Sequence, residues 1–245
     1  TADGEALLRR LTYDLHGLPP TNSEAEAFAR EFDAAVARDV LSLRNGQPAR
    51  SASLVLERTI DRLLASPRYG ERWARHWLDI VRYTDSFDSR ASAAQDPTEI
   101  YKYRDWVIGA FNGDMPYDRF LKYQIAGDVI AAQLPQYDPE GVIATGVLAI
   151  GAWPQGDADK QKMVCDIVDD QIDLVCRGFM GVTMGCARCH DHKFDPVSMQ
   201  DYYALHGVFS SSEEPAELPL LGPLRDSEEY RAFLAKKVAA EEKVK

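Results

Sequence analysis

The sequence predicts an all-α protein. Apolar side chains recur every three or four residues, as in the first helix candidate, where Leu7, Leu8, Leu11 and Leu15 share one face. Glycine, proline and helix-capping residues separate such stretches. No segment shows the strict alternation of apolar and polar residues that is typical of half-buried strands.

The first two helix candidates have clear start and stop signals. The first covers residues 5–15 and ends at the Gly-Leu-Pro-Pro turn of residues 17–20. Thr21 and Ser23 are each followed three residues later by a glutamate, which predicts overlapping capping boxes. They begin a short helix that we expect to end near Phe32.

The remaining elements follow from the same rules. We expect further helices over residues 53–65, 71–84, 97–111, 117–126, 158–185, 198–209 and 227–243. Residues 43–52 are polar and contain a glycine and a proline, so we interpret them as a loop. Residues 142–153 are apolar and favour either a short buried helix or an extended segment. Residues 213–223 have the composition of a Pro/Leu linker.

Composition and charge narrow the function classes. The chain has 245 residues, 45% of them hydrophobic, and a formal net charge of −11. Such an acidic chain does not favour nucleic-acid binding, because phosphates are repelled. No run of about 18 apolar residues occurs, so we expect no membrane span.

Residues 186–190 form the string Cys-Ala-Arg-Cys-His. Cys-x-x-Cys-His is the attachment signature of a c-type haem. Cys186 and Cys189 would form thioethers with the porphyrin, and His190 would be the proximal ligand of the iron. We therefore expect one covalently bound haem c. We also expect a periplasmic or otherwise exported protein, with a leader that residues 1–5 do not contain.

Two closely spaced cysteines also permit other chemistry. A thioredoxin-like redox pair normally accompanies a βαβ pattern, which is not evident here. A structural zinc site would add His190 or His192 and draw further ligands from a distant segment. The other cysteines, Cys165 and Cys176, do not have knuckle spacing, and we expect them to be buried thiols.

His76 is the candidate for a distal haem ligand. It follows Trp73 and precedes Trp77 on a helix face that we expect to be buried, so a core histidine is the alternative. Arg72 and Arg75 flank it, and an arginine fork suits haem propionates, although surface ion pairs are the commoner use.

His192 follows His190 too closely to reach the opposite face of the same haem. We expect it to bond a propionate or carbonyl, or to form a second metal site with Asp191 or Asp195. Methionine is the other common sixth ligand. The methionines nearest the motif in sequence are Met163, Met180, Met184 and Met199.

The helix before the motif carries carboxylates opposite an apolar stripe. Asp166, Asp170 and Asp173 lie on this polar face, which we interpret as solvated rather than as a cation or partner site.

Five segments carry a resemblance to a known family. They are residues 8–20, 61–79, 103–108, 185–196 and 201–205, the fourth reading Gly-Cys-Ala-Arg-Cys-His-Asp-His-Lys-Phe-Asp-Pro. In this order they resemble the planctomycete-type cytochrome c domain family, which is uncharacterised. The resemblance spans about residues 5–210. Residues 33–52 look longer than is usual there, and His206 is outside the family's pattern.

The resemblance implies a c-type haem domain from large exported multidomain proteins. It also implies that the positions of His76, His192 and Asp195 matter. The fold class that we expect is an irregular, all-α, multi-helix, cytochrome-c-like haem domain with long connecting loops. It would occupy residues 1–212, and residues 213–245 would form the linker and a charged helix leading to a further domain.

The expected function is electron transfer to or from a redox partner protein or an adjoining domain. A haem-dependent, peroxidase-like oxidoreductase with an open distal site is the first alternative. A zinc-binding structural module is the second. Catalytic residues are not assigned by the sequence.

Overall fold

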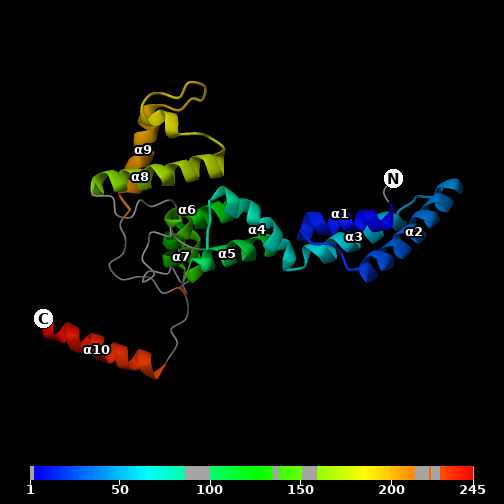
Figure 1. Cartoon of the computed structure of the whole chain (residues 1–245), viewed down its shortest axis with the longest axis horizontal. Coiled ribbons are helices and arrows are strands. Elements are labelled where there is room, and N and C mark those ends of the chain that lie inside the picture. The colour runs from blue at the N-terminus through cyan, green and yellow to red at the C-terminus, as the bar shows by residue number, and fades with distance from the viewer. Residues whose placement is uncertain are drawn as a thin grey trace.

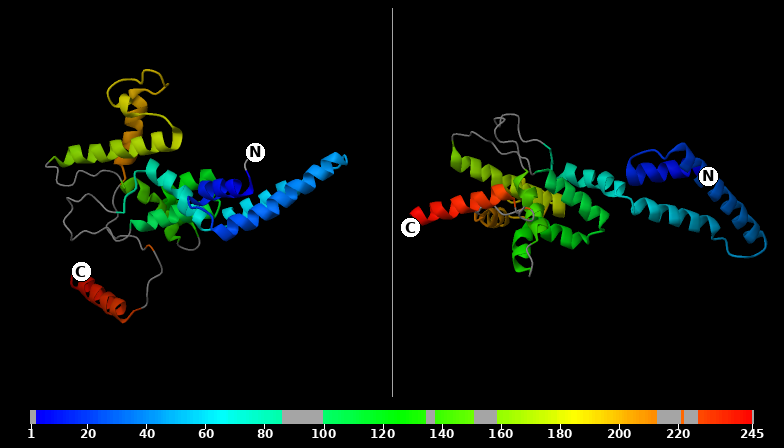
Figure 2. Two further views of the ribbon diagram at one scale, coloured as in Figure 1. Left: turned by 45° about the vertical axis from the view of Figure 1, so that its right-hand side comes forward. Right: turned by 90° about the horizontal axis from the view of Figure 1, so that it is seen from below.

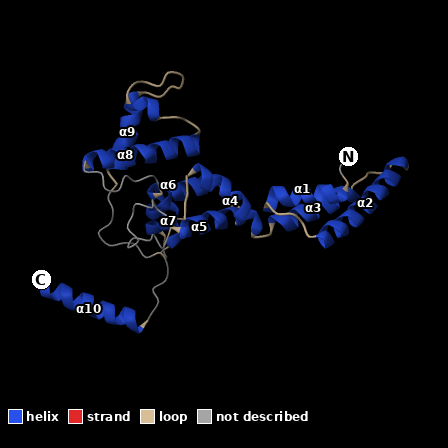
Figure 3. Ribbon diagram, in the orientation of Figure 1, coloured by secondary structure: helices blue, strands red, loops and turns tan. Residues whose placement is uncertain are grey.

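The computed structural model describes residues 3–85, 100–134, 138–150, 159–212, 221 and 227–244. Within these ranges it contains helices and loops and no strand, which confirms the all-α class (Figure 3). None of the described helices is both long enough and apolar enough to cross a membrane.

The first three helices pack together at one end of the molecule (Figure 1). They are α1 (Gly4–His16), α2 (Asn22–Arg44) and α3 (Ser51–Leu64). The predicted capping box is present, since Thr21 Oγ1 accepts from Glu24 N and the Glu24 carboxylate accepts from Thr21 N. The expectation that this helix ends near residue 32 is wrong, because α2 continues and packs on α3 with Ala35 fully buried.

The central group contains α4 (Arg68–Ile80), α5 (Tyr101–Asn112), α6 (Tyr117–Gln133), α7 (Pro139–Thr145) and the 3₁₀ turn η1 (Gly146–Ala149). The helical alternative for residues 142–153 is confirmed as far as residue 149, whereas residues 151–153 lie outside the described part. Residues 97–99, with which we expected the helix of residues 97–111 to begin, also lie outside the described part. α6 runs past its expected end through a bend at Ala126.

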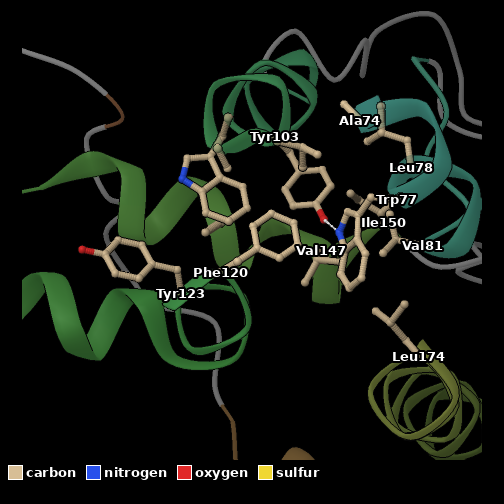
Figure 4. Close-up of a cluster of buried hydrophobic side chains, with 14 residues drawn as sticks. Ala74, Trp77, Leu78, Val81, Tyr103, Phe120, Tyr123, Val147, Ile150 and Leu174 are labelled. Atoms are coloured by element: carbon tan, nitrogen blue, oxygen red, sulfur yellow. Dashed lines mark hydrogen bonds between the residues drawn. The ribbon is translucent and has the colours of Figure 1, made fainter. Parts of the chain in front are cut away.

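Buried hydrogen bonds organise the core of this central group, and Figure 4 draws the one from Trp77 Nε1 to Tyr103 Oη, which measures 3.1 Å. Gln124 is fully buried, and its Oε1 accepts from Trp77 Nε1 at 2.9 Å and from Tyr103 Oη at 2.7 Å. Its Nε2 donates to the Phe120 carbonyl at 3.1 Å. The four groups satisfy one another, as buried polar groups must.

The last compact group consists of α8 (Lys160–Asp173), the π-helical turn η2 (Leu174–Phe179), the 3₁₀ turn η3 (Gly185–Arg188) and α9 (Met199–Ser210). The expected single helix to residue 185 is too long. It ends near Gly181, because the left-handed φ of 68° at this residue cannot continue a right-handed helix. α8 and α9 lie against each other at a steep angle in both views of Figure 2.

Apolar and polar contacts join this group to the centre, including a hydrogen bond from Gln171 Nε2 to the Leu148 carbonyl at 3.1 Å. Leu174 and Phe179 of η2 belong to the central apolar core. Arg82, just after α4, donates two hydrogen bonds to Asp170 of α8, at 2.6 and 3.0 Å. The attachment motif is therefore tied through α8 to the rest of the protein.

The final helix, α10 (Glu228–Val244), exposes every side chain between residues 231 and 240. This exposure agrees with the few apolar anchors in its sequence. Most of the predicted linker, residues 213–223, lies outside the described residues. The predicted division at residue 212 stays a prediction.

Candidate functional site

The Cys-x-x-Cys-His motif lies on a short turn between α8 and α9, in the yellow-to-gold loop of Figure 1. Ala187 N donates to the Met184 carbonyl at 2.8 Å. The amides of Cys189 and His190 both donate to the Cys186 carbonyl at 3.3 Å. These bonds fold the motif into η3 and the turn that follows it.

The residues of the motif divide into an inward and an outward set. Ala187 is 0% exposed and packs in a cluster with Val168, Ile172 and other side chains of α8 and α9. Cys186 and Cys189 are exposed free thiols. His190 is exposed as well. The intervening residues thus anchor the turn, and the three residues of the attachment signature face outward.

The second intervening residue, Arg188, is held by acids of α8. Its Nη1 donates to Asp169 Oδ2 at 3.1 Å, and its Nη2 lies 3.7 Å from Asp166 Oδ1. The Asp169 charge raises the pKa of Arg188. Tyr203 Oη donates to the Arg188 carbonyl at 3.1 Å. The side chain and the backbone of Arg188 are therefore both restrained.

Tyr202 completes this arrangement from α9. Its side chain is buried, and its Oη donates to Asp169 Oδ1 at 2.5 Å. Burial, together with the acceptor carboxylate of Asp169, raises the pKa of Tyr202. Asp169 thus uses one oxygen for α9 and the other for the motif.

His190 has one nitrogen engaged and one available. Its Nδ1 lies 2.8 Å from the carbonyl oxygen of Asp191. Because a carbonyl can only accept, Nδ1 carries a proton, and in the neutral ring Nε2 then keeps its lone pair. This is the arrangement by which proteins orient a histidine for a metal. Asp191 is itself fixed, since its Oδ1 accepts from Met199 N at 2.8 Å.

His192 has the opposite arrangement. Its side chain is 9% exposed, and its Nδ1 accepts from the amide of Asp195 at 2.9 Å and from that of Phe194 at 3.4 Å. An accepting Nδ1 is unprotonated, so the contact of 3.3 Å with Asp195 Oδ2 is not an ion pair with this tautomer. Nε2 lies 3.5 Å from Thr183 Oγ1. His192 therefore closes the loop with both nitrogens occupied.

The described residues contain no group of three or more His, Cys, Asp or Glu side chains that could hold a metal ion. His192 and Asp195 are in contact, and no third ligand of this kind joins them within the described ranges.

His76, Arg72 and Arg75 lie on α4, which packs against α1 and α5, whereas η3 packs against α9. The structure therefore does not bring these three residues together with the motif. The expected burial of the His76 face is wrong, because His76 is exposed and its ring neighbour Trp73 is 37% exposed. Trp77 takes the buried position, since it points into the central core.

The methionines near the motif and the histidine at the end of α1 occupy varied positions. Met184 is buried beside the motif, and Met180 and Met199 are exposed. His16 is committed elsewhere, because its Nε2 donates to the Leu63 carbonyl at 2.9 Å. Of the two cysteines that we expected to be buried, Cys176 is fully buried and Cys165 is partly exposed.

The carboxylates of α8 are paired rather than free on a solvated face. Asp166 bonds Lys162, Asp170 bonds Arg82, and Asp173 bonds Arg177. Sequence reasoning missed Asp169 and its two partners altogether. The sequence signal for this contact was the arginine inside the motif. A guanidinium next to a buried residue such as Ala187 commonly pairs with a carboxylate of the helix on which that residue packs.

Several large apolar side chains close to the motif in sequence are exposed. Phe194 is 83% exposed, and Met180, Met199 and Tyr203 are also well exposed.

The fold and site define an all-α protein that presents an anchored Cys-x-x-Cys-His turn to the outside. The chain belongs to the family described as PSCyt2, protein of unknown function (DUF1549), whose model matches residues 1–214. No curated protein and no solved structure matches the chain.

Proposed function

We propose that this chain is a c-type cytochrome domain that carries one covalent haem at Cys186, Cys189 and His190. The observation that supports the proposal is the hydrogen bond between His190 Nδ1 and the Asp191 carbonyl on an exposed side chain, because it leaves Nε2 of the neutral ring as the nitrogen that would bind the haem iron.

The side chains at and near the Cys-x-x-Cys-His motif are chemically suited to hold a haem. Cys186 and Cys189 are exposed free thiols, which is the state that thioether formation requires. The exposed apolar side chains of Phe194, Met180 and Met199 would pack against a porphyrin ring. When bound, a haem supplies one-electron redox chemistry, with a potential tuned by its axial ligands and surroundings.

The protein's own contribution is to orient the ligand and to hold the loop that follows it. Asp191 holds the imidazole ring of His190 through its carbonyl. His192 closes the loop of residues 192–197, with a further bond from its own amide to the Val197 carbonyl at 2.8 Å.

The same proposal includes the cellular role. The domain exchanges electrons with a redox partner protein or an adjoining domain, in the periplasm or another exported location. A net charge of −11 favours a partner with a basic contact surface.

The test is an absorption spectrum of the protein produced with export in a host that attaches haem. Wild type is expected to keep its haem after acid-acetone extraction and to give a c-type α band in the pyridine haemochrome assay. Cys186→Ser and Cys189→Ser should each lose one thioether. His206→Ala, a change on α9 outside the motif, is the matched control. A colourless wild-type protein would overturn the proposal.

The ligand state separates the two redox roles. A six-coordinate reduced spectrum supports electron transfer. Binding of cyanide or carbon monoxide supports the alternative role as a haem-dependent oxidoreductase with an open distal site. Stoichiometric zinc in a colourless protein would support the structural zinc module.

A further inference from the structure

Asp169 connects three elements through its carboxylate. Oδ1 accepts from Tyr202 of α9, and Oδ2 accepts from Arg188 at the end of η3. Asp169 itself lies on α8, so its carboxylate connects this helix with α9 and with η3. No other described carboxylate near the motif accepts hydrogen bonds from both α9 and η3.

The Arg188 guanidinium is placed between two acids of one helix face. Asp166 and Asp169 are three residues apart on α8, so they are neighbours on its surface. Nη1 bonds Asp169, and Nη2 lies near Asp166. An arginine fork can address two carboxylates at fixed angles, whereas a lysine acts as a single flexible point charge.

Restraint of Arg188 restrains the attachment residues on either side of it. Its carbonyl is held by Tyr203, and the preceding Ala187 has no room to move because it is fully buried. Cys189 follows directly, and its amide bonds the Cys186 carbonyl. Ala187 and Arg188, the two residues between the cysteines, are therefore both held in place by tertiary contacts.

We infer that Asp169, Arg188 and Tyr202 form a clasp that positions Cys186, Cys189 and His190 for the cofactor, with Asp169 as its central positioning residue. The clasp makes the geometry of the attachment turn depend on the folded α8–α9 pair. This inference rests on the proposed function, because it assigns the clasp a role in haem attachment.

The first experiment compares Asp169→Asn with Asp170→Asn. The two changes remove the same charge from adjacent positions of α8, but Asp170 pairs with Arg82 outside the clasp. Covalent haem per chain is expected to fall about tenfold in Asp169→Asn, the scale of lost metal-site support. It should stay near the wild-type level in Asp170→Asn.

A second readout does not depend on haem. Deuterium exchange of the peptide covering residues 185–190 is measured in the haem-free protein. Asp169→Asn should accelerate that exchange by about tenfold, without changing exchange in α4–α7. Asp169→Glu, which restores the charge, should recover at least part of both effects, which a general loss of folding would not permit.

A double-mutant cycle tests whether the residues act together. Asp169→Asn combined with Arg188→Gln should lower haem content by clearly less than the two single effects together, since both changes break the same Asp169–Arg188 contact. Fully additive effects would overturn the clasp.

The outcomes distinguish the clasp from the proposed function. If wild type holds haem and Asp169→Asn matches it in haem content and in exchange, the clasp is refuted and the haem proposal stands. If wild type is colourless but the exchange of residues 185–190 still depends on Asp169, the haem proposal fails and the clasp survives as a device that orders the turn.

Discussion

The two histidines of the motif loop should respond in opposite ways to replacement by alanine. His190 is exposed and makes one hydrogen bond to a carbonyl that water can reach. His192 is nearly buried and accepts from two backbone amides. Replacement of His190 should change the spectrum of the holoprotein and leave the loop intact. Replacement of His192 should destabilise the loop.

The size of the effect follows from the contacts. A net hydrogen bond contributes about 0.5–1.5 kcal/mol. The bond to Asp195 N, at 2.9 Å, is a full one, and the bond to Phe194 N, at 3.4 Å, is weak. His192→Ala should therefore lower the free energy of opening the loop by about 1–2 kcal/mol. For His190→Ala the change should be within about 0.5 kcal/mol, as for other exposed positions.

The assay is deuterium exchange of the peptide spanning residues 191–198 in the haem-free protein. A loss of about 1–2 kcal/mol corresponds to exchange roughly 5–30 times faster. His192→Asn is the matched control, because its side-chain oxygen can accept from the same amides. Equal exchange in His190→Ala and His192→Ala would refute the assigned tautomers and the division of roles.

Three further outcomes are expected. Gly127→Ala should disrupt the crossing of α6 and α7, because its Cβ would lie 2.3 Å from the Gly141 carbonyl oxygen, whereas Gly109→Ala meets nothing within 4 Å and should be tolerated in thermal unfolding. Gln124→Leu should destabilise by about 1–3 kcal/mol in urea unfolding, since a buried hydroxyl loses its acceptor; a neutral effect would contradict the buried network. The pKa of Tyr202 is raised in the folded protein. Its contribution to the free energy of unfolding is therefore fully present below the pKa of an unfolded tyrosine, about 10, and is lost as the pH rises from there through the pKa of the folded state. Stability measured by circular dichroism from neutral to alkaline pH should fall less steeply in Tyr202→Phe than in wild type.

Much of the helical architecture could be predicted because its signals are local. α1 and α9 agree with the expected ranges to within about a residue or two, as capping and turn signals generally allow. The errors lie where tertiary packing decides. α2 extends beyond residue 32 because Ala35 is buried between helices, and that burial cannot be read from the neighbouring residues.

The candidate site divides in the same way. Cys186, Cys189 and His190 are found by spacing alone, since the attachment signature is a string of five residues. The prediction for His76 depended on which side of α4 faces the core, and there the sequence pattern was misleading. Trp77 occupies the core side, and His76 lies in solvent.

The sequence by itself determined the all-α class and the five-residue motif, because both depend on residues that are close along the chain. Only the tertiary structure decided which acid holds the motif. Asp169 is 19 residues from Arg188 and 33 from Tyr202, and Arg82 is 88 from Asp170. Contacts over such separations exist only once the helices have packed, since α8 must lie beneath α9 before one carboxylate can reach both partners.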